Sequence, residues 1–136
     1  MKKIATLLFA VIALAACNQQ PPQKTTTIQQ QETSFDATLA NAAANNQKVF
    51  VEVYATYCGS CKKFKANVLS DKEVADKLAV NTATALVDLE SEEGKKLASR
   101  YEVQATPTFL LLDAQGNVLK KSLGYMDKTA FLAWIN

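Results

Sequence analysis

The chain has 136 residues, 49% of them hydrophobic and 21% charged, which is typical of one globular domain with a modest core. The formal net charge is only +2 and no basic stripe is present, so nothing in the sequence suggests nucleic-acid binding. There is no histidine and there are only three cysteines, so the usual ligands of a structural zinc site are missing.

The first 16 residues have the pattern of a secretory signal peptide. Lys2 and Lys3 form a short basic region, and residues 4–16 are an uncharged apolar run. As a helix this run would be about 20 Å long, too short for a bilayer core of roughly 30 Å, so it is not expected to span a membrane. Removal of the two lysines leaves 13 basic and 13 acidic residues, and the mature chain is then formally neutral.

The signal segment ends at Cys17, in the stretch Leu14-Ala15-Ala16-Cys17. This stretch resembles the lipobox of bacterial lipoproteins, and the resemblance implies that the Cys17 thiol is acylated and becomes the first mature residue. The alternative is an ordinary signal peptide with a chance cysteine. Asn18 follows, not the aspartate that retains many lipoproteins at the inner membrane, which favours the outer membrane of a Gram-negative cell.

Residues 17–33 are predicted to be the lipidated cysteine followed by a disordered tether. The stretch is rich in Gln, Thr and Pro and almost free of apolar residues, so it cannot bury enough surface to fold. Its reach would be roughly 20 Å as a coil and up to about 50 Å when extended. Residues 34–136 are predicted to form the folded domain.

The folded domain alternates helix and strand patterns. Ser34 is expected to cap a helix, and the apolar run after it is expected to be a buried strand. A helix then begins at the cysteines, and Ser70 and Glu73 have the spacing of a capping box for the next one. The predicted helices are residues 34–47, one from about 58, one opened by residues 70–73, 91–103 and 128–136, and the predicted strands are 48–55, 82–89, 107–113 and 118–124.

This order predicts an α/β fold. Strands separated by helices are expected to pair in parallel through right-handed crossovers. The short turn at residues 113–117 predicts that the last two strands form an antiparallel hairpin. The expected result is a four-stranded mixed sheet flanked by helices on both faces.

Cys58 and Cys61 are separated by two residues, where the first strand gives way to a helix. A metal site of two sulfurs plus carboxylates is one interpretation, but it has few ligands. An inert disulfide is another, although so short a loop constrains little of the unfolded chain. A redox pair is favoured, because free N–H groups at a helix start stabilise a thiolate. Lys62, Lys63 and Lys65 add positive charge, or simply form a solvated face.

The stretches "VYATYCGSCKKFK" and "VQATPTFLLLD" resemble thioredoxin: a strand, a Cys-x-x-Cys motif, and later a proline before a strand. The resemblance covers residues 48–136. It is closer still to the C-terminal periplasmic domain of thiol:disulfide interchange proteins of the DsbD type, which have a similar Cys-x-x-Cys-Lys-x-Phe and a Gly-aromatic-Met-Asp segment like Gly124 to Asp127. It implies a thioredoxin-like fold.

The resemblance also implies roles for individual residues. Cys58 would be the attacking thiolate and Cys61 the resolving thiol. Pro107 matches the cis-proline of the family, whereas the sequence alone also allows an ordinary proline at a strand start. The residues implied in substrate binding are Tyr57, Gly59, Ser60, Thr106, Pro107 and Gly124.

Glu52 lies six positions before Cys58, where thioredoxins have a buried acid. A buried carboxylate has a raised pKa and could exchange a proton with Cys61 during resolution. The alternative is a solvent-facing residue, which strand alternation also permits.

Three departures from thioredoxin leave the direction of electron flow open. Tyr57 replaces the usual tryptophan, and Gly59-Ser60 replaces Gly-Pro. If the second strand is in register, Ala85 stands where thioredoxin has a lysine near its buried acid.

The sequence thus predicts a periplasm-facing, lipid-anchored thiol:disulfide oxidoreductase that favours reduction of protein disulfides. It would need no metal or organic cofactor, since the Cys58–Cys61 couple carries two electrons. The expected partners are protein disulfides, a membrane electron donor of the DsbD type and the membrane itself, and the expected state is a monomer. The alternatives are an oxidase or isomerase of the same fold, and a peptide-binding or envelope-assembly module without turnover.

Overall fold

The computed structural model describes residues 34–136. The signal peptide, Cys17 and the tether predicted above lie outside the described residues. The elements are α1 (Phe35–Asn45), β1 (Lys48–Tyr54), α2 (Gly59–Phe64), the π-helix η1 (Lys65–Leu69), α3 (Lys72–Asn81), β2 (Thr82–Asp88), α4 (Glu92–Tyr101), β3 (Thr108–Leu112), β4 (Val118–Leu123) and α5 (Lys128–Ile135). In this part of the chain no helix is long and apolar enough to cross a membrane.

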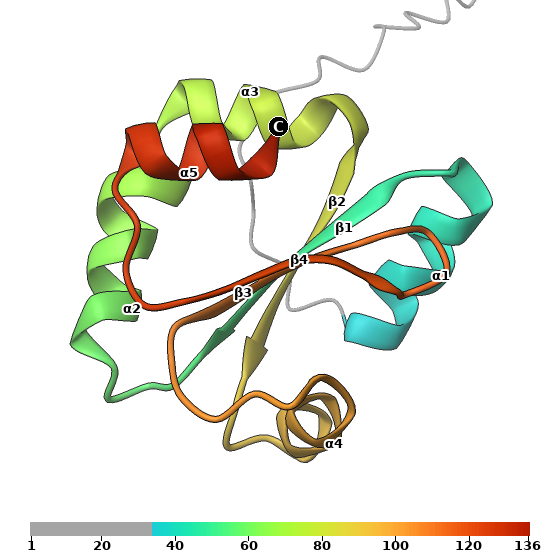
Figure 1. The fold of residues 1–136 in the computed structure, drawn as a ribbon, viewed down its shortest axis with the longest axis horizontal. Helices are drawn as coiled ribbons and strands as arrows, with labels where there is room; N and C mark the ends of the chain where they lie inside the picture. The colour runs from blue at the N-terminus through green and yellow to red at the C-terminus, as the bar shows by residue number, and fades with distance from the viewer. Residues whose placement is uncertain (1–33) are drawn as a thin grey trace, which may run out of the picture.

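The predicted fold class is confirmed. The four strands form one mixed sheet in the order β2-β1-β3-β4, with helices on both faces (Figure 1). β1 pairs with β2 in parallel, and β3 pairs antiparallel with both β1 and β4. The predicted hairpin between the last two strands is therefore present, closed by a turn in which Asp113 accepts the N–H groups of Gln115 and Asn117.

The expectation that strands separated by helices pair in parallel is wrong for β3. α4 separates β2 from β3, but these strands do not pair, and β3 runs antiparallel to β1. Figure 1 shows the reason: α4 is seen end-on on the same face of the sheet as α1, so it runs across the strands and not back along them. The chain consequently starts β3 at the end of the sheet where β1 finishes, with Val53 opposite Thr108.

Both faces of the sheet are buried. Alternate residues of β1, namely Val49, Val51 and Val53, pack with α1 and α4 on one face. Phe50 points to the other face, where it packs with residues of α2, η1, α3 and α5. An aromatic cluster forms the centre of this second layer, in which the ring centroids of Phe64 and Phe109 are 4.4 Å apart. This contact fixes the helix that carries the cysteines onto the sheet.

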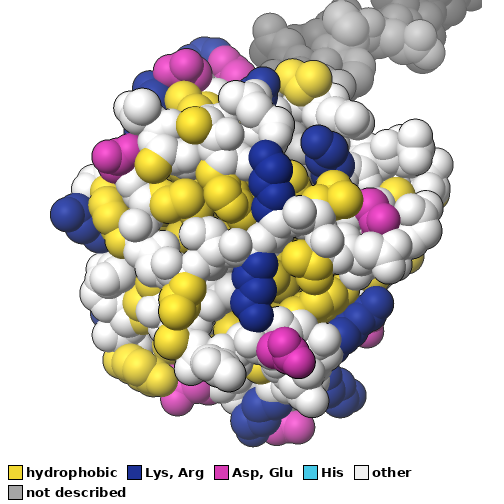
Figure 2. Space-filling model, viewed as in Figure 1, with side chains coloured by type: hydrophobic (Ala, Val, Ile, Leu, Met, Phe, Trp, Pro, Cys, Tyr) yellow, Lys and Arg dark blue, Asp and Glu magenta, His cyan; other side chains and the backbone are white. Residues whose placement is uncertain are grey.

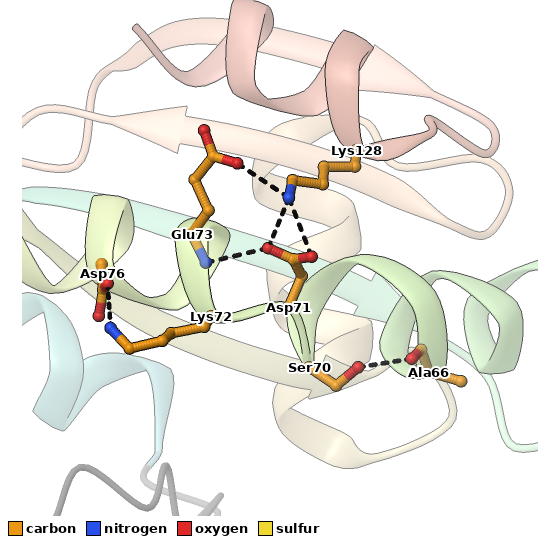
Figure 3. Close-up of polar contacts among 7 residues, drawn as sticks. All are labelled: Ala66, Ser70, Asp71, Lys72, Glu73, Asp76 and Lys128. Carbon is orange, nitrogen blue, oxygen red and sulfur yellow. Dashed lines mark hydrogen bonds and ion pairs between the residues drawn. The ribbon is translucent and has the colours of Figure 1, made fainter.

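The start of α3 differs from the predicted capping box. The N-cap is Asp71, whose carboxylate accepts the N–H of Glu73 at 2.9 Å, and the Ser70 hydroxyl instead donates to the Ala66 carbonyl in η1 (Figure 3). Ser70 still belongs to the end of the preceding helix, because the Ser70 N–H donates to the Lys65 carbonyl. The N-cap of α3 is therefore the next residue, Asp71. Lys128 of α5 also binds Asp71, at 3.0 Å, and so ties the last helix to α3.

Two consecutive lysines connect the edge strand β4 to two helices that lie on opposite faces of the sheet. The Lys120 ammonium donates to the carbonyls of Trp134 and Asn136 at the end of α5. The Lys121 ammonium donates to the carbonyls of Tyr101 and Glu102 at the end of α4. Figure 2 shows basic side chains lying among hydrophobic ones over this strand. Each lysine supplies donors to carbonyls that a helix end leaves unpaired.

Gly94, in the first turn of α4, allows that helix to approach the end of β2 closely. A Cβ at this position would lie 1.9 Å from the Asp88 carbonyl oxygen and 2.8 Å from the Leu89 Cα. Both are backbone atoms, so relief would require movement of the strand or the helix.

We expect Gly94→Ala to destabilise the protein by roughly 1–3 kcal/mol, although alanine normally stabilises a helix relative to glycine. The matched control is Gly59→Ala, where a Cβ would meet nothing within 4 Å. Urea denaturation of both variants measures the difference. Equal stability of the two variants would show that the contact at Gly94 does not constrain the fold.

Candidate active site

The first strand and the helix after it position the two cysteines. Cys58 is the N-cap of α2, four residues after the end of β1. Its N–H donates to the Ala55 carbonyl at 3.0 Å, and its carbonyl accepts the N–H of Lys62 at 3.2 Å. The turn after the strand and the first turn of the helix therefore meet at Cys58.

Cys58 and Cys61 form a disulfide, with their Cα atoms 5.3 Å apart. The Cys61 N–H donates to the Cys58 Sγ at 3.1 Å, so a backbone donor of the helix start already points at this sulfur. Cys58 is 8% exposed and Cys61 4% exposed. Gly59 and Ser60 between them are exposed, so the segment that joins the two cysteines faces solvent.

Two further segments lie at the same end of the sheet. The Thr106–Pro107 peptide bond is cis, and Pro107 leads directly into β3. The Gly124 N–H donates to the Pro107 carbonyl at 2.9 Å. Because Val53 pairs with Thr108, the chain that leaves β1 toward Cys58 passes beside the chain that enters β3. The structure thus places Cys58, Cys61, Thr106, Pro107 and Gly124 at the same end of the sheet.

Tyr57 is 71% exposed, directly before Cys58. It forms no part of the buried core, and its ring lies at the surface.

Glu52 is buried in the middle of β1, with 2% of its surface exposed. It lies between Leu86 of β2 and Phe109 of β3, both apolar. Burial raises its pKa from 4.5 to about 7, and the ammonium of Lys65 opposes the rise. The solvent-facing alternative for Glu52 is therefore wrong, because β1 is an interior strand covered on both faces.

The register also answers the question raised by Ala85. Ala85 pairs with Val51, not with Glu52, and packs in the core on the α1 side of the sheet. β2 therefore offers no cation opposite Glu52 in this chain. The opposing charge comes from Lys65 in η1.

Two contacts near the cysteines were not anticipated from the sequence, and neither was the effect of Lys65 on the pKa of Glu52. The Lys63 ammonium lies 4.8 Å from the centroid of the Tyr125 ring. The Thr56 hydroxyl lies 3.5 Å from a carboxylate oxygen of Glu90. For Lys65 the sequence offered one signal: it lies four residues after Cys61 in the same helical stretch, so the two side chains start on one side of that helix.

Comparison with known proteins supports what the geometry suggests. The thioredoxin-like domain family matches residues 35–136. The chain belongs to the thioredoxin-like family. A thioredoxin from Thermus thermophilus has the same fold at a TM-score of 0.68 and 30% identity, with 74% of this chain and 80% of that one covered.

The chain is also similar to the thiol:disulfide interchange protein DsbD of Pseudoalteromonas atlantica. The two are 33% identical over 103 residues, or 73% of this chain, and the match spans only 17% of the DsbD protein. The reduced C-terminal domain of Neisseria meningitidis DsbD shares the fold at a TM-score of 0.65 and 22% identity, with 74% and 90% of the two chains covered. This thioredoxin-like chain thus resembles one domain of a much longer protein.

The raised pKa of Glu52 predicts a pH-dependent stability. Because the folded protein holds the Glu52 proton more tightly than the unfolded chain, this contribution is complete below pH 4.5 and is lost as the pH rises to about 7. Over that range we expect the free energy of unfolding of the oxidised protein to fall by about 3 kcal/mol relative to Glu52→Gln. Urea denaturation across the range measures it; parallel pH profiles for the two proteins would contradict the prediction.

Proposed function

We propose that the chain is a thiol:disulfide oxidoreductase that reduces protein disulfides through the Cys58–Cys61 couple. The observation that carries the proposal is the disulfide itself, seated at the start of α2 and at the end of the sheet where Pro107 leads into β3. The matches to DsbD, which is named for thiol:disulfide interchange, support the same chemistry.

In the reduced protein, the Cys58 thiolate attacks one sulfur of a substrate disulfide. A bond forms between Cys58 Sγ and that sulfur, and the other substrate sulfur leaves as a thiolate and takes a proton. The helix-start N–H that now points at Cys58 Sγ stabilises the attacking thiolate.

Cys61 then attacks Cys58 Sγ, which releases the second substrate thiolate and leaves the Cys58–Cys61 disulfide. Two electrons have passed to the substrate. Cys61 must lose its proton in this step, and the Glu52 carboxylate, with a pKa of about 7, accepts it in our proposal. The couple supplies the redox chemistry without a metal or organic cofactor.

The extended partner segment would lie against Thr106 and Pro107, with Tyr57, Gly59, Ser60 and Gly124 around it. Thr106 is half-buried, and the carbonyl of Pro107 after it accepts the Gly124 N–H. A dithiol donor in the membrane, of the DsbD type, would return the electrons. The direction of flow is proposed by analogy with DsbD.

We further propose that the domain acts as a monomer on the periplasmic side of the bacterial envelope, held by lipid on Cys17 and favouring the outer membrane. The support is the sequence pattern around Cys17 and the match to DsbD. A tether of the length of residues 18–33 would leave the domain free to turn toward its partners.

Cysteine variants test the proposed chemistry. In the purified mature protein, Cys58→Ser is expected to reduce turnover of a model protein disulfide at least about 100-fold, since the attacking sulfur is gone. Cys61→Ala is expected to accumulate mixed disulfides on Cys58, visible on non-reducing gels. Ser99→Ala, exposed on α4, is the control.

Full biological activity of Cys58→Ser, together with a wild type that cannot reduce the model disulfide, would contradict an enzyme and indicate a binding module. Partners trapped by Cys61→Ala in cells test the direction. If Cys61→Ala traps an oxidising partner, and not a membrane reductase and its clients, the proposed direction of electron flow is wrong.

The lipid anchor has its own test. We expect Cys17→Ala to move the protein from the membrane fraction to the soluble periplasmic fraction, because a diacylated cysteine is what would hold the mature chain at the bilayer. Mass spectrometry of the wild-type N-terminal peptide should show the acyl chains on Cys17. An unmodified cysteine in that peptide would rule out the anchor.

A further inference from the structure

Two charged side chains of opposite sign lie at the end of the sheet where β1 finishes. Because β2 runs parallel to β1, the turn after β2 lies at this end, and it carries Glu90. β4 runs antiparallel to β3 and also finishes here, and the turn after it carries Tyr125, whose ring the Lys63 ammonium faces. In the strand order β2-β1-β3-β4, Cys58 follows β1 and Pro107 precedes β3. The cysteine and the proline therefore lie between an acidic turn and a basic one.

The turn that carries Glu90 is tied to the chain that leads into the cysteines. The Leu89 N–H donates to the Tyr54 carbonyl at 2.8 Å, which joins this turn to the end of β1. The Thr56 hydroxyl lies 3.5 Å from a carboxylate oxygen of Glu90. Thr56 is exposed and lies two residues before Cys58, so the negative charge is held on the surface next to the site.

The turn after β4 is fastened on both sides of Tyr125. The Gly124 N–H donates to the Pro107 carbonyl at 2.9 Å, and Met126 packs against the aromatic cluster. Tyr125 between them is 37% exposed, and the Lys63 ammonium lies 4.8 Å from its ring centroid. Figure 1 shows this turn passing beside α2. The cation–π contact consequently places the positive charge of α2 at the β4 side of the site.

The chain itself neutralises neither charge. Ion pairs within residues 34–136 are formed by Lys72 with Asp76, by Lys95 with Glu92, and by Lys128 with Asp71 and Glu73. Glu90 and Lys63 belong to none of them, and both are exposed. The ends of β2 and β4 are three strand spacings apart, or roughly 14 Å, which exceeds the screening length of about 8 Å at physiological salt. Each charge therefore acts separately on whatever docks between them.

The other charged groups at this end leave the two signs apart. The Asp88 carboxylate accepts the Glu90 N–H at 3.0 Å, so it adds negative charge on the β2 side. Lys62, next to Lys63 on α2, is exposed and adds positive charge to that helix. Asp127 is occupied as the N-cap of α5, where its carboxylate accepts the Ala130 N–H.

We propose that Glu90 and Lys63 select protein partners with a basic residue on one side of the attacked cysteine and an acidic residue on the other; the inference rests on the proposed function. The basic residue of the partner pairs with Glu90 and the acidic one with Lys63. Complementary charges at both sides fix the direction in which the partner segment crosses Cys58 and speed its docking. A segment with the opposite order of charges meets like charges at both sides.

Two peptides of identical composition test this selection. They are the disulfide-linked dimers of acetyl-Gly-Lys-Cys-Glu-Gly-amide and of acetyl-Gly-Glu-Cys-Lys-Gly-amide, which have the same net charge and differ only in charge order. We expect the reduced mature protein to be oxidised about fivefold faster by one isomer at low salt, about 10 mM, with the rates converging near 0.5 M. Alkylation of the remaining thiols and mass spectrometry measure this single turnover.

Charge variants assign the preference to the two residues. Glu90→Gln and Lys63→Met should each lower it to about twofold, because one attractive contact remains. The double variant Glu90→Lys with Lys63→Glu keeps the net charge and should reverse the preferred isomer. The matched control exchanges the exposed pair of α3, as Lys72→Glu with Asp76→Lys, and should keep the wild-type preference.

The outcomes separate this inference from the proposed function. An unchanged preference in the exchanged Glu90 and Lys63 variant would overturn the selection, and so would a reversal in the α3 control. Reduction of both isomers at equal rates by the wild type at low salt would overturn the selection and leave the proposed function intact. A wild type that reduces neither isomer would contradict the proposed function, and the selection would fall with it.

Discussion

The contact between Phe64 and Phe109 is the interaction on which the candidate site depends. It seats α2 on the sheet, and both cysteines take their positions from that helix. Phe131 completes the cluster from α5, with its ring centroid 5.2 Å from that of Phe64. Because aromatic rings bury large areas and pack in specific geometries, the cluster fixes the helix more closely than hydrogen bonds from a loop could. The sulfur chemistry is thus held in place by the core itself.

The same core imposes a cost at Glu52. A carboxyl group between Leu86 and Phe109 loses its hydration, and its ionised form is disfavoured. An apolar residue at this position would stabilise the fold at neutral pH. This cost is consistent with the proton transfer to Glu52 that we propose, because buried acids with a raised pKa gather at functional sites.

The local patterns of the sequence predicted most elements, the mixed sheet and the cysteine motif, because each depends on neighbouring residues. The antiparallel direction of β3 could not be predicted in this way, since it depends on where α4 lies in space. The burial of Glu52 could not be predicted either. Because β1 has apolar residues on both faces, the alternation of side chains does not tell which face is exposed to solvent. Asp71 and Ser70 are both good caps, and only the end of η1 decides between them. Nothing in the sequence distinguished Lys65 from a solvent-exposed lysine, so its effect on the pKa of Glu52 could not be predicted.

The two lysines of β4 have a consequence for how the domain opens. Lys120 holds the end of α5 and Lys121 the end of α4, so helices on opposite faces of the sheet share one strand as an anchor. Detachment of the edge strand would free the last turns of both helices together. Amide hydrogens in those turns should consequently exchange with solvent as one cooperative unit with β4, while the cysteine-bearing helix, anchored by aromatic rings, stays protected.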